Sequence, residues 1–414
     1  MGSAIFTGVT GLQVHQRKID VIASNIANVN TTGYRGSRAL FQDLFSQTIS
    51  GPSAPLGSFG GKNGSQVGLG VRLGAIDINF TQGTLLNTGV SSDLAIQGSG
   101  FFILNGGGAN YYSRDGSFTI NANGELVSSA TGLFVQGFQA DSNGQILSNT
   151  PVSNISIPLG TSAIVRATTD VSLIGNLDSN AAVGDTLVRN VQVYDSLGTA
   201  RDIQITFTKS ATTNVWDWAA TSTDPDFAAI TATGSVTFDA GGAVIAGGTG
   251  NVSIAFVAGL PAAPVDPFVF DFDFTNLTQL AATGDVAVIT QDGFPRGTLE
   301  AFNIGGNGVL NGVFSNGLTQ VLGQVALATF ANNGGLVREG SNLFRESPGS
   351  GIAQIGTPST GGRGQISGGV LEGSNVDLGT EFSNLIVTQR GFQANARTIT
   401  TADTLLQETV NLVR

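Results

Sequence analysis

Hydrophobic residues recur every seven positions at both ends of the chain, and this helical period is confined to the ends. A seven-residue repeat places apolar side chains on one stripe of an α-helix and is typical of coiled coils. We therefore predict two terminal helices whose stripes pack against each other or against further copies of the chain. The predicted stripe residues are Ile5, Leu12, Ile19, Ile22, Ile26 and Val29 near the start, and Leu378, Phe382, Leu385, Phe392, Ile399, Leu406, Val410 and Val413 near the end.

Between these ends, apolar and polar residues alternate as in β-strands. Residues 112–138 alternate on both sides of Asn123-Gly124, a dipeptide typical of tight hairpin turns. A second hairpin is predicted with its turn at residues 195–198, after Val193 and before Ile203. Residues 51–70 hold seven glycines and two prolines with little periodicity, which indicates an extended linker or loop.

These patterns predict a mainly β protein with two terminal α-helices, an antiparallel β-rich middle and domains that are nested and discontinuous. We expect a helical domain from residues 1–33 and 376–414, followed by an extended linker over residues 34–70. An inner β-domain would combine residues 71–150 and 292–375. Residues 151–291 would form an outer, inserted β-domain.

Composition narrows the class of protein. The 414 residues are 11% charged and include 59 glycines, which suits turn-rich β-structure. A net charge of −11 leaves no basic surface for nucleic acid or an anionic membrane. We find no apolar run of about 18 residues for a membrane helix and no cleavable secretory signal.

The sequence holds few groups for catalysis or for metal binding. It has no cysteine and a single histidine, His15, so Ser/His/Asp, Cys/His and zinc sites lack their usual residues. Asp271 and Asp273 alternate with phenylalanines, so an amphipathic strand is favoured over a hydrolase carboxylate pair or a calcium site. Trp216 and Trp218 favour core packing over a carbohydrate platform. We therefore expect no enzyme activity, no cofactor and no metal.

Longer motifs carry a family resemblance. "NIANVNTTGYR" covers residues 25–35, "GLGVRLGAIDINFTQGTLLNTGVSSDLAIQGSGFFIL" begins at residue 68, and "SNVDLGTEFSNLIVTQRGFQANARTITTADTLLQETVNLVR" ends the chain. Together with "VYDSLG" from residue 193, these segments resemble the family of flagellar rod and hook proteins. Residues 151–291 add a β-rich block between the two halves of the inner β-domain, and "VYDSLG" within this block resembles the outer domain of the hook members. It favours a hook protein over the alternative, a distal rod protein; a surface adhesin is the alternative from another class.

The resemblance implies a protein that polymerises into a flexible hollow tube, which transmits torque and passes exported subunits. Its partners would be further copies of itself, the distal rod, the hook cap, the hook-filament junction protein and the export apparatus, in an extracellular part of the bacterial flagellum. The implied export path is the flagellar channel, without a cleaved signal peptide. The motif residues Asn25, Asn28, Asn30, Thr31, Thr32, Gly33 and Tyr34 would end the first helix and turn the chain outward, because Asn and Gly tolerate left-handed backbone conformations.

Overall fold

The computed structural model describes residues 2–54, 60–141, 144–147, 149–157, 163–260, 262 and 264–412. The chain forms two compact units. Unit 1 comprises Met1–Ile157, Phe302–Asn311 and Val321–Arg414, and unit 2 comprises Pro158–Ala301 and Gly312–Gln320. The chain thus enters unit 2 from unit 1 and returns, so both units are discontinuous in sequence.

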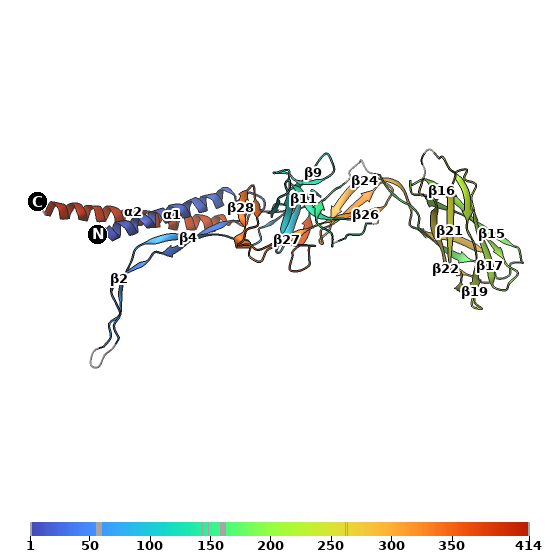
Figure 1. The fold of residues 1–414 in the computed structure, drawn as a ribbon, viewed down its shortest axis with the longest axis horizontal. Helices are drawn as coiled ribbons and strands as arrows, with labels where there is room; N and C mark the ends of the chain where they lie inside the picture. Colours follow the sequence, from blue (N-terminus) through green and yellow to red (C-terminus); the bar gives the residue numbers. More distant parts are fainter. Residues whose placement is uncertain are drawn as a thin grey trace. The chain divides into compact units, whose positions relative to one another are not determined.

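Two long helices of unit 1 pair with each other, which confirms the predicted pair of terminal helices. They are α1 (Gly2–Ala27) and α2 (Leu378–Leu412). They run antiparallel, because Gly8 lies against Ile399 whereas His15 lies against Gly391 (Figure 1). In the described part of the chain, no helix is sufficiently long and apolar to span a membrane.

Two antiparallel ribbons follow α1, and all of their strands except the last lie in residues 34–70, which the sequence assigned to a linker. β1 (Ser37–Asp43) pairs with β4 (Val71–Ile78), and β2 (Ser46–Ser50) pairs with β3 (Ser65–Gly68). The β1–β4 ribbon contacts α1. Every residue of β2 and β3 is exposed, so this second ribbon has no packed face within the chain.

The β-structure of unit 1 has a sheet with the strand order β26-β11-β7-β8-β29-β28, to which shorter strands add. β9 and β10 form the hairpin predicted around Asn123-Gly124. Phenylalanine rings such as Phe101, Phe330 and Phe344 meet edge-on in its core. The elements are β5 (Leu85–Asn87), β6 (Leu94–Gln97), β7 (Phe101–Asn105), β8 (Asn110–Ser113), β9 (Phe118–Ile120), β10 (Leu126–Ser128), β11 (Phe134–Gln139), β12 (Ser153–Asn154), β27 (Leu327–Thr329), the 3-10 helix η1 (Asn333–Gly335), β28 (Val337–Gly340), β29 (Leu343–Arg345), β30 (Gln354–Gly356), β31 (Gln365–Gly368) and β32 (Val370–Glu372). Three strands contribute residues to both units: β24 (Phe294–Ile304), β25 (Val309–Phe314) and β26 (Thr319–Val325).

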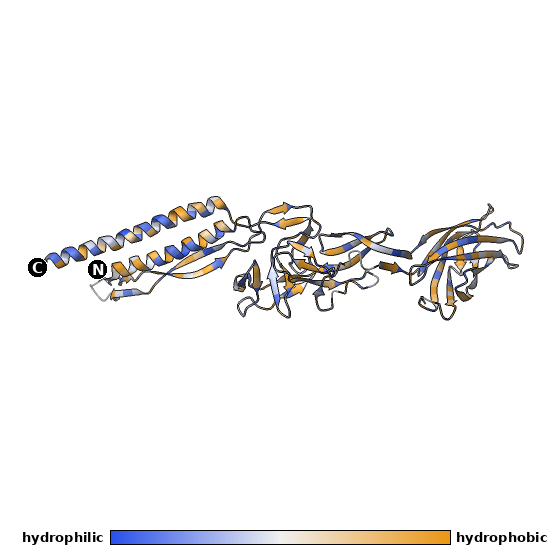
Figure 2. Ribbon diagram, turned by 90° about the horizontal axis from the view of Figure 1, so that it is seen from above, coloured by the Kyte–Doolittle hydropathy of each residue, from blue (hydrophilic) through white to orange (hydrophobic). Residues whose placement is uncertain are grey.

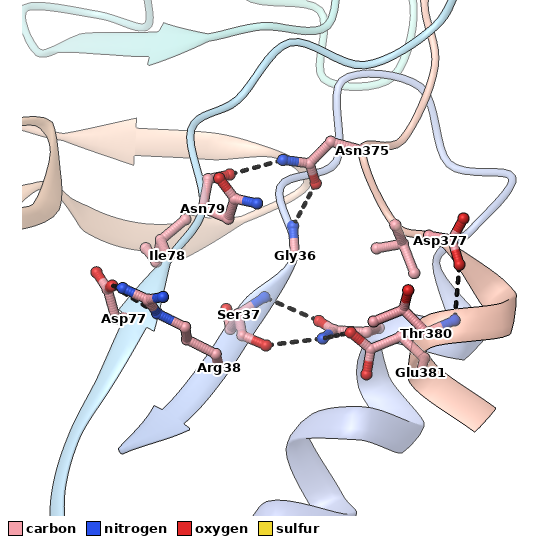
Figure 3. A pocket seen from close by; sticks show the side chains of 12 residues that line it. Gly36, Ser37, Arg38, Asp77, Ile78, Asn79, Asn375, Asp377, Thr380 and Glu381 are labelled. Atoms are coloured by element: carbon pink, nitrogen blue, oxygen red, sulfur yellow. Dashed lines mark hydrogen bonds and ion pairs between the residues drawn. The ribbon is translucent and has the colours of Figure 1, made fainter. Parts of the chain in front are cut away.

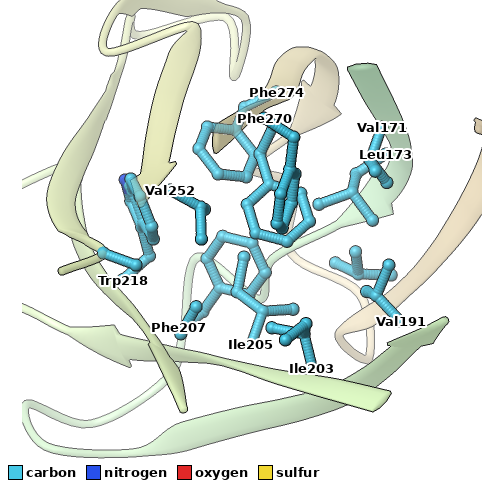
Figure 4. Packing of buried hydrophobic residues seen from close by; sticks show 14 of the residues in the cluster. Val171, Leu173, Val191, Ile203, Ile205, Phe207, Trp218, Val252, Phe270 and Phe274 are labelled. Atoms are coloured by element: carbon cyan, nitrogen blue, oxygen red, sulfur yellow. The ribbon is translucent and has the colours of Figure 1, made fainter. Parts of the chain in front are cut away.

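Unit 2 contains two five-stranded sheets with the orders β18-β21-β22-β14-β23 and β15-β16-β17-β19-β20. Their inner faces share one apolar core, in which Phe270 and Phe274 of one sheet lie near Phe207 and Trp218 of the other (Figure 4). Most pairs are antiparallel, but β14 and β22 are parallel. The strands of unit 2 are β13 (Ala163–Arg166), β14 (Asp170–Asn176), β15 (Thr186–Tyr194), β16 (Ala200–Lys209), β17 (Val215–Thr221), β18 (Phe227–Thr231), β19 (Thr233–Phe238), β20 (Val244–Ala246), β21 (Thr249–Phe256), β22 (Phe268–Thr278) and β23 (Asp285–Gln291).

The turn of the "VYDSLG" motif closes the predicted β15–β16 hairpin. Asp195 Oδ1 accepts the backbone N–H groups of Leu197 and Thr199, and Gly198 takes a positive φ of 77°. Asp195 Oδ2 accepts Arg201 Nε at 3.1 Å. The Arg201 Nη1 atom also donates to Asp224 and Asp226 at 2.8 and 2.7 Å. One guanidinium therefore joins this turn to the segment before β18.

Replacing Arg201 by glutamine is expected to lower the free energy of unfolding of unit 2 by about 1 to 3 kcal/mol at pH 7, because charge-assisted hydrogen bonds are lost. Burial opposes ionisation of Asp224, but hydrogen bonds from Arg201 and the Asp226 N–H outweigh it and lower the pKa of Asp224. The stability that this carboxylate contributes is present above about pH 4 and is lost as the pH falls through its lowered folded-state pKa. The difference between variant and parent should therefore shrink below about pH 4. Tryptophan fluorescence during urea unfolding measures it, since Trp216 and Trp218 both lie in unit 2.

Candidate self-assembly site

The two terminal helices approach each other closely along a line of small residues. A Cβ atom on Gly11 would lie 2.5 Å from Asn395 Oδ1, and one on Gly391 would lie 2.5 Å from His15 Cε1. A Cβ on Gly8 would lie 2.8 Å from Ile399 Cγ1. The helix pair therefore depends on glycines that a seven-residue apolar repeat does not reveal.

The predicted stripe residues lie at different depths in this pair. Ile22 of α1 is buried. Four further stripe residues of α1 are half-buried, and so is Val29, which follows the helix: Ile5, Leu12, Ile19 and Ile26. On α2, Leu385 and Ile399 are half-buried, whereas Leu378, Phe382, Phe392, Leu406 and Val410 are exposed. Val413 lies outside the described residues. The assignment of these residues to subunit contacts stays a prediction.

Much of the apolar surface of α2 is left uncovered by α1. Phe382, Ile386, Val387 and Val410 are 50%, 52%, 65% and 65% exposed. Figure 2 shows hydrophobic residues along both helices. We define the uncovered residues of α2 as Leu378, Phe382, Ile386, Val387, Phe392, Leu405, Leu406 and Val410. An exposed apolar surface of this extent marks an interaction site in soluble proteins.

Asn25 is one of the motif residues that the sequence assigned to stopping the first helix. Asn25 instead lies inside α1, is 1% exposed and pairs with the backbone of Ser37. Its Nδ2 donates to Ser37 O at 2.7 Å and its Oδ1 accepts Ser37 N at 2.9 Å. The side chain thus imitates a peptide group and holds the start of β1 against the helix.

A second asparagine repeats this arrangement before α2. Asn375 Oδ1 accepts Gly36 N at 2.8 Å, and its Nδ2 donates to Asn79 O at 2.8 Å (Figure 3). Both asparagines line a pocket of about 400 Å³, where Asp377 accepts the Thr380 N–H and caps α2. Burial raises the pKa of Glu381 in the same pocket. The polar groups that line this pocket make structural hydrogen bonds and do not form an arrangement for catalysis.

The other motif residues form the turn after α1. Asn28 Nδ2 donates to Ser24 O at 2.9 Å and Asn28 Oδ1 accepts the Thr31 hydroxyl at 3.1 Å, while Asn30 is exposed. Thr32 O accepts Asn342 Nδ2 at 2.8 Å, so the β28–β29 hairpin holds this turn. Arg338 belongs to the same hairpin, and its guanidinium lies 5.2 Å from the centroid of the Tyr34 ring.

A buried ionic cluster that sequence reasoning missed joins this turn to the β-structure. Glu372 Oε1 accepts Arg35 Nη2 at 2.7 Å and Gly83 N at 2.9 Å, and Oε2 accepts Arg114 Nη1 at 3.3 Å. The three charged side chains are at most 5% exposed. Burial lowers the pKa of Arg114 to about 10, so it remains charged at neutral pH. Two buried cations therefore depend on one carboxylate.

Replacing Gly33 by alanine is expected to destabilise unit 1 by about 3 kcal/mol or more, because left-handed geometry and overpacking both cost energy. Gly33 has a φ of 67°, and a Cβ there would lie 2.5 Å from the backbone nitrogen of Asp115. Gly89 is the matched control, since its φ is 70° but a Cβ there would meet nothing within 4 Å. Gly89→Ala should cost only about 1 kcal/mol. Urea unfolding followed by far-UV circular dichroism measures both, and equal losses would refute the close contact.

The remaining candidate residues are buried in a core or make hydrogen bonds within the β-structure. Trp216 and Trp218 are 2% and 4% exposed in the core of unit 2. Asp271 accepts Asn251 Nδ2, and Asp273 accepts the hydroxyls of Ser172 and Thr275. Among the described residues, no group of three or more His, Asp or Glu side chains is arranged to hold a metal ion.

Four family models match segments of the chain in order. They are described as "Flagella basal body rod protein" for residues 5–35, "Flagellar hook protein FlgE/F/G D1 domain" for 95–172, "Flagellar basal body protein FlaE D2 domain" for 167–294, and "Flagellar basal body rod FlgEFG protein C-terminal" for 367–412. The second and third of these overlap the β-structure of the two units.

Whole-chain relatives agree with these matches. The chain is 38% identical to the flagellar hook protein FlgE of Treponema pallidum (strain Nichols) and 37% identical to that of Borreliella burgdorferi, with all of each chain covered. It is 29% identical to the flagellar basal-body rod protein FlgG of Bacillus subtilis (strain 168), with 99% of each chain covered. The chain therefore belongs to the flagellar hook protein family.

Proposed function

We propose that the chain polymerises into the flagellar hook, a hollow helical tube that bends while it transmits torque and passes exported subunits. The observation that carries the proposal is the set of uncovered residues of α2. α1 leaves these residues of α2 uncovered, and further copies of the chain are the partners that can cover them. Head-to-tail contacts that do not close on themselves produce an open helical polymer.

The rest of the molecule suits an assembly role. The β2–β3 ribbon exposes Phe45 beside it and Ile49 within it, at 89% and 67%, and an isolated two-stranded ribbon is marginal in water. A neighbouring copy would cover these side chains as well. We propose that the protein is structural and does no catalysis. The adhesin alternative would use Trp216, Trp218 and the strand of Asp271 and Asp273, and the burial of both tryptophans argues against it.

The predicted domains and partners follow from the same proposal. The helices of residues 1–33 and 376–414 would form the inner tube, and residues 151–291 would form the outer domain. The partners would be further copies of the chain, the distal rod, the hook cap, the junction protein and the export apparatus. The protein would act outside the cell as part of the flagellum.

Electron microscopy of the concentrated full-length chain tests the proposal. We expect curved tubes, and we expect a chain that lacks residues 376–414 to remain unassembled while it keeps the tryptophan fluorescence of folded unit 2. Straight tubes would favour a rod. Failure of the full-length chain to form any tube would contradict the proposal.

A further inference from the structure

His15, the one histidine of the chain, lies where three elements of unit 1 meet. Its ring packs on the backbone of α2, because a Cβ on Gly391 would lie 2.5 Å from His15 Cε1 and 2.8 Å from Nε2. On β1, the Phe41 ring meets the His15 ring edge-on, with 5.3 Å between their centroids. The same ring therefore touches the second helix and the ribbon that packs on the first.

The surroundings of the His15 Nδ1 atom disfavour a protonated imidazole. His15 Nδ1 is buried and has no hydrogen-bond acceptor among the described residues. A protonated ring is a donor at both nitrogens, so it would place an unpaired N–H and a positive charge inside the packing.

The charges on the surrounding elements are mainly positive. α1 carries Arg17, Lys18 and Asp20 near His15, α2 has only Arg390 and Arg397 between Glu381 and Asp403, and the β1–β4 ribbon carries Arg38, Asp43, Arg72 and Asp77. Arg38 pairs with Asp77 and Arg72 donates to Gln42. Lys18 Nζ lies 5.6 Å from the centroid of the Phe41 ring that His15 touches.

We propose that His15 is a pH-sensitive switch, whose neutral ring holds α1, α2 and β1 together and whose protonation loosens all three. Its effect on assembly rests on the proposed function, since the same helix pair would carry the contacts between copies. If the His15 ring moved away from Gly391, the packing of α1 against α2 would change. The polymer should therefore lose subunits under mildly acidic conditions.

The direction of the pH dependence follows from the environment of the ring. Burial, and then the charge of Lys18, lower the pKa of His15 from its usual 6.5. The paired state thus binds fewer protons than the separated state. Its stability is complete above about pH 6.5 and falls as the pH drops toward the lowered pKa.

The test measures the critical concentration of tubes of the full-length chain by sedimentation between pH 7.5 and 5.5. For the parent chain we expect a rise of up to about tenfold, the limit for one linked proton with a reference pKa of 6.5. His15→Phe keeps an aromatic ring without the titration, so its critical concentration should change much less. Lys18→Gln should raise the pKa of His15 in the paired state toward that of the separated state, so the rise in critical concentration should be smaller than in the parent.

A spectroscopic readout separates this switch from a loss of folding. With ¹³C-labelled histidine the chain gives one imidazole signal set, and its midpoint in sedimented tubes should lie below that in the urea-unfolded chain. Equal midpoints, or equal pH dependence of the parent and His15→Phe, would overturn the proposal. If no tubes formed at pH 7.5, the proposed function would fail instead, while the imidazole midpoint in the folded, unassembled chain would still test the switch.

Discussion

Replacing Glu372 by glutamine is expected to lower the free energy of unfolding of unit 1 by about 3 to 5 kcal/mol, the usual cost of removing one partner from a buried ionic group. The carboxylate is fully buried and serves both Arg35 and Arg114. Glutamine would still accept one hydrogen bond but would leave two buried guanidinium groups without a counter-charge. Hydrogen exchange of unit 1 amides, measured on the full-length chain, gives the loss directly.

Glu339 provides the matched control for this change. Its carboxylate pairs with Arg345 Nε at 2.7 Å, but the two side chains are 34% and 57% exposed. Glu339→Gln should therefore cost no more than about 1 kcal/mol. The tryptophan fluorescence transition of unit 2 should be the same in both variants. Similar losses for Glu372→Gln and Glu339→Gln would show that the buried ionic cluster contributes no more to the stability of unit 1 than an exposed ion pair.

Replacing Val387 by lysine is expected to raise the critical concentration for assembly by about 30-fold or more. Full burial of a valine contributes about 1.5 to 3 kcal/mol, and burial of an unpaired ammonium adds a further penalty. In the single chain Val387 is 65% exposed, so the substitution should leave its folding unchanged. Sedimentation of tubes and circular dichroism of the unassembled chain measure the two effects separately.

Val387→Glu adds the opposite charge at the same position as a control. The chain carries a net charge of −11, so a general charge effect should have opposite signs for the two substitutions. Burial of either charge in a contact is costly, so we expect the critical concentration to rise by about 30-fold or more for both. Opposite effects of the two substitutions would indicate a general charge effect rather than a contact through the uncovered residues of α2.

The sequence predicted the elements that rest on a regular period. The seven-residue repeats identified both terminal helices, and the turn residues at Asn123-Gly124 and at 195–198 located two hairpins. The four phenylalanines at alternate positions from 268 to 274 are buried on one face of β22, as their spacing predicts. These signals are local, so they can be followed along the chain without knowledge of the fold.

Features that depend on contacts between distant residues were not predicted. Glycines of each terminal helix lie against residues of the other helix more than 300 positions away, and Arg35 and Glu372 are similarly distant, so no spacing rule connects them. The prediction that Asn25 stops the helix was wrong because its amide pairs with Ser37. Residues 34–70 had too little periodicity to predict their strands, whose partners lie up to 41 positions apart.

The most direct test of the account is the accessibility of position 387 before and after assembly. The chain has no cysteine, so Val387→Cys introduces a single thiol. Its reaction rate with a maleimide should fall at least about tenfold on passing from unassembled chain to tubes, as expected for burial that excludes the reagent by more than about 1.4 kcal/mol. An unchanged rate in well-formed tubes would mean that the uncovered residues of α2 remain in solvent, and would contradict the account.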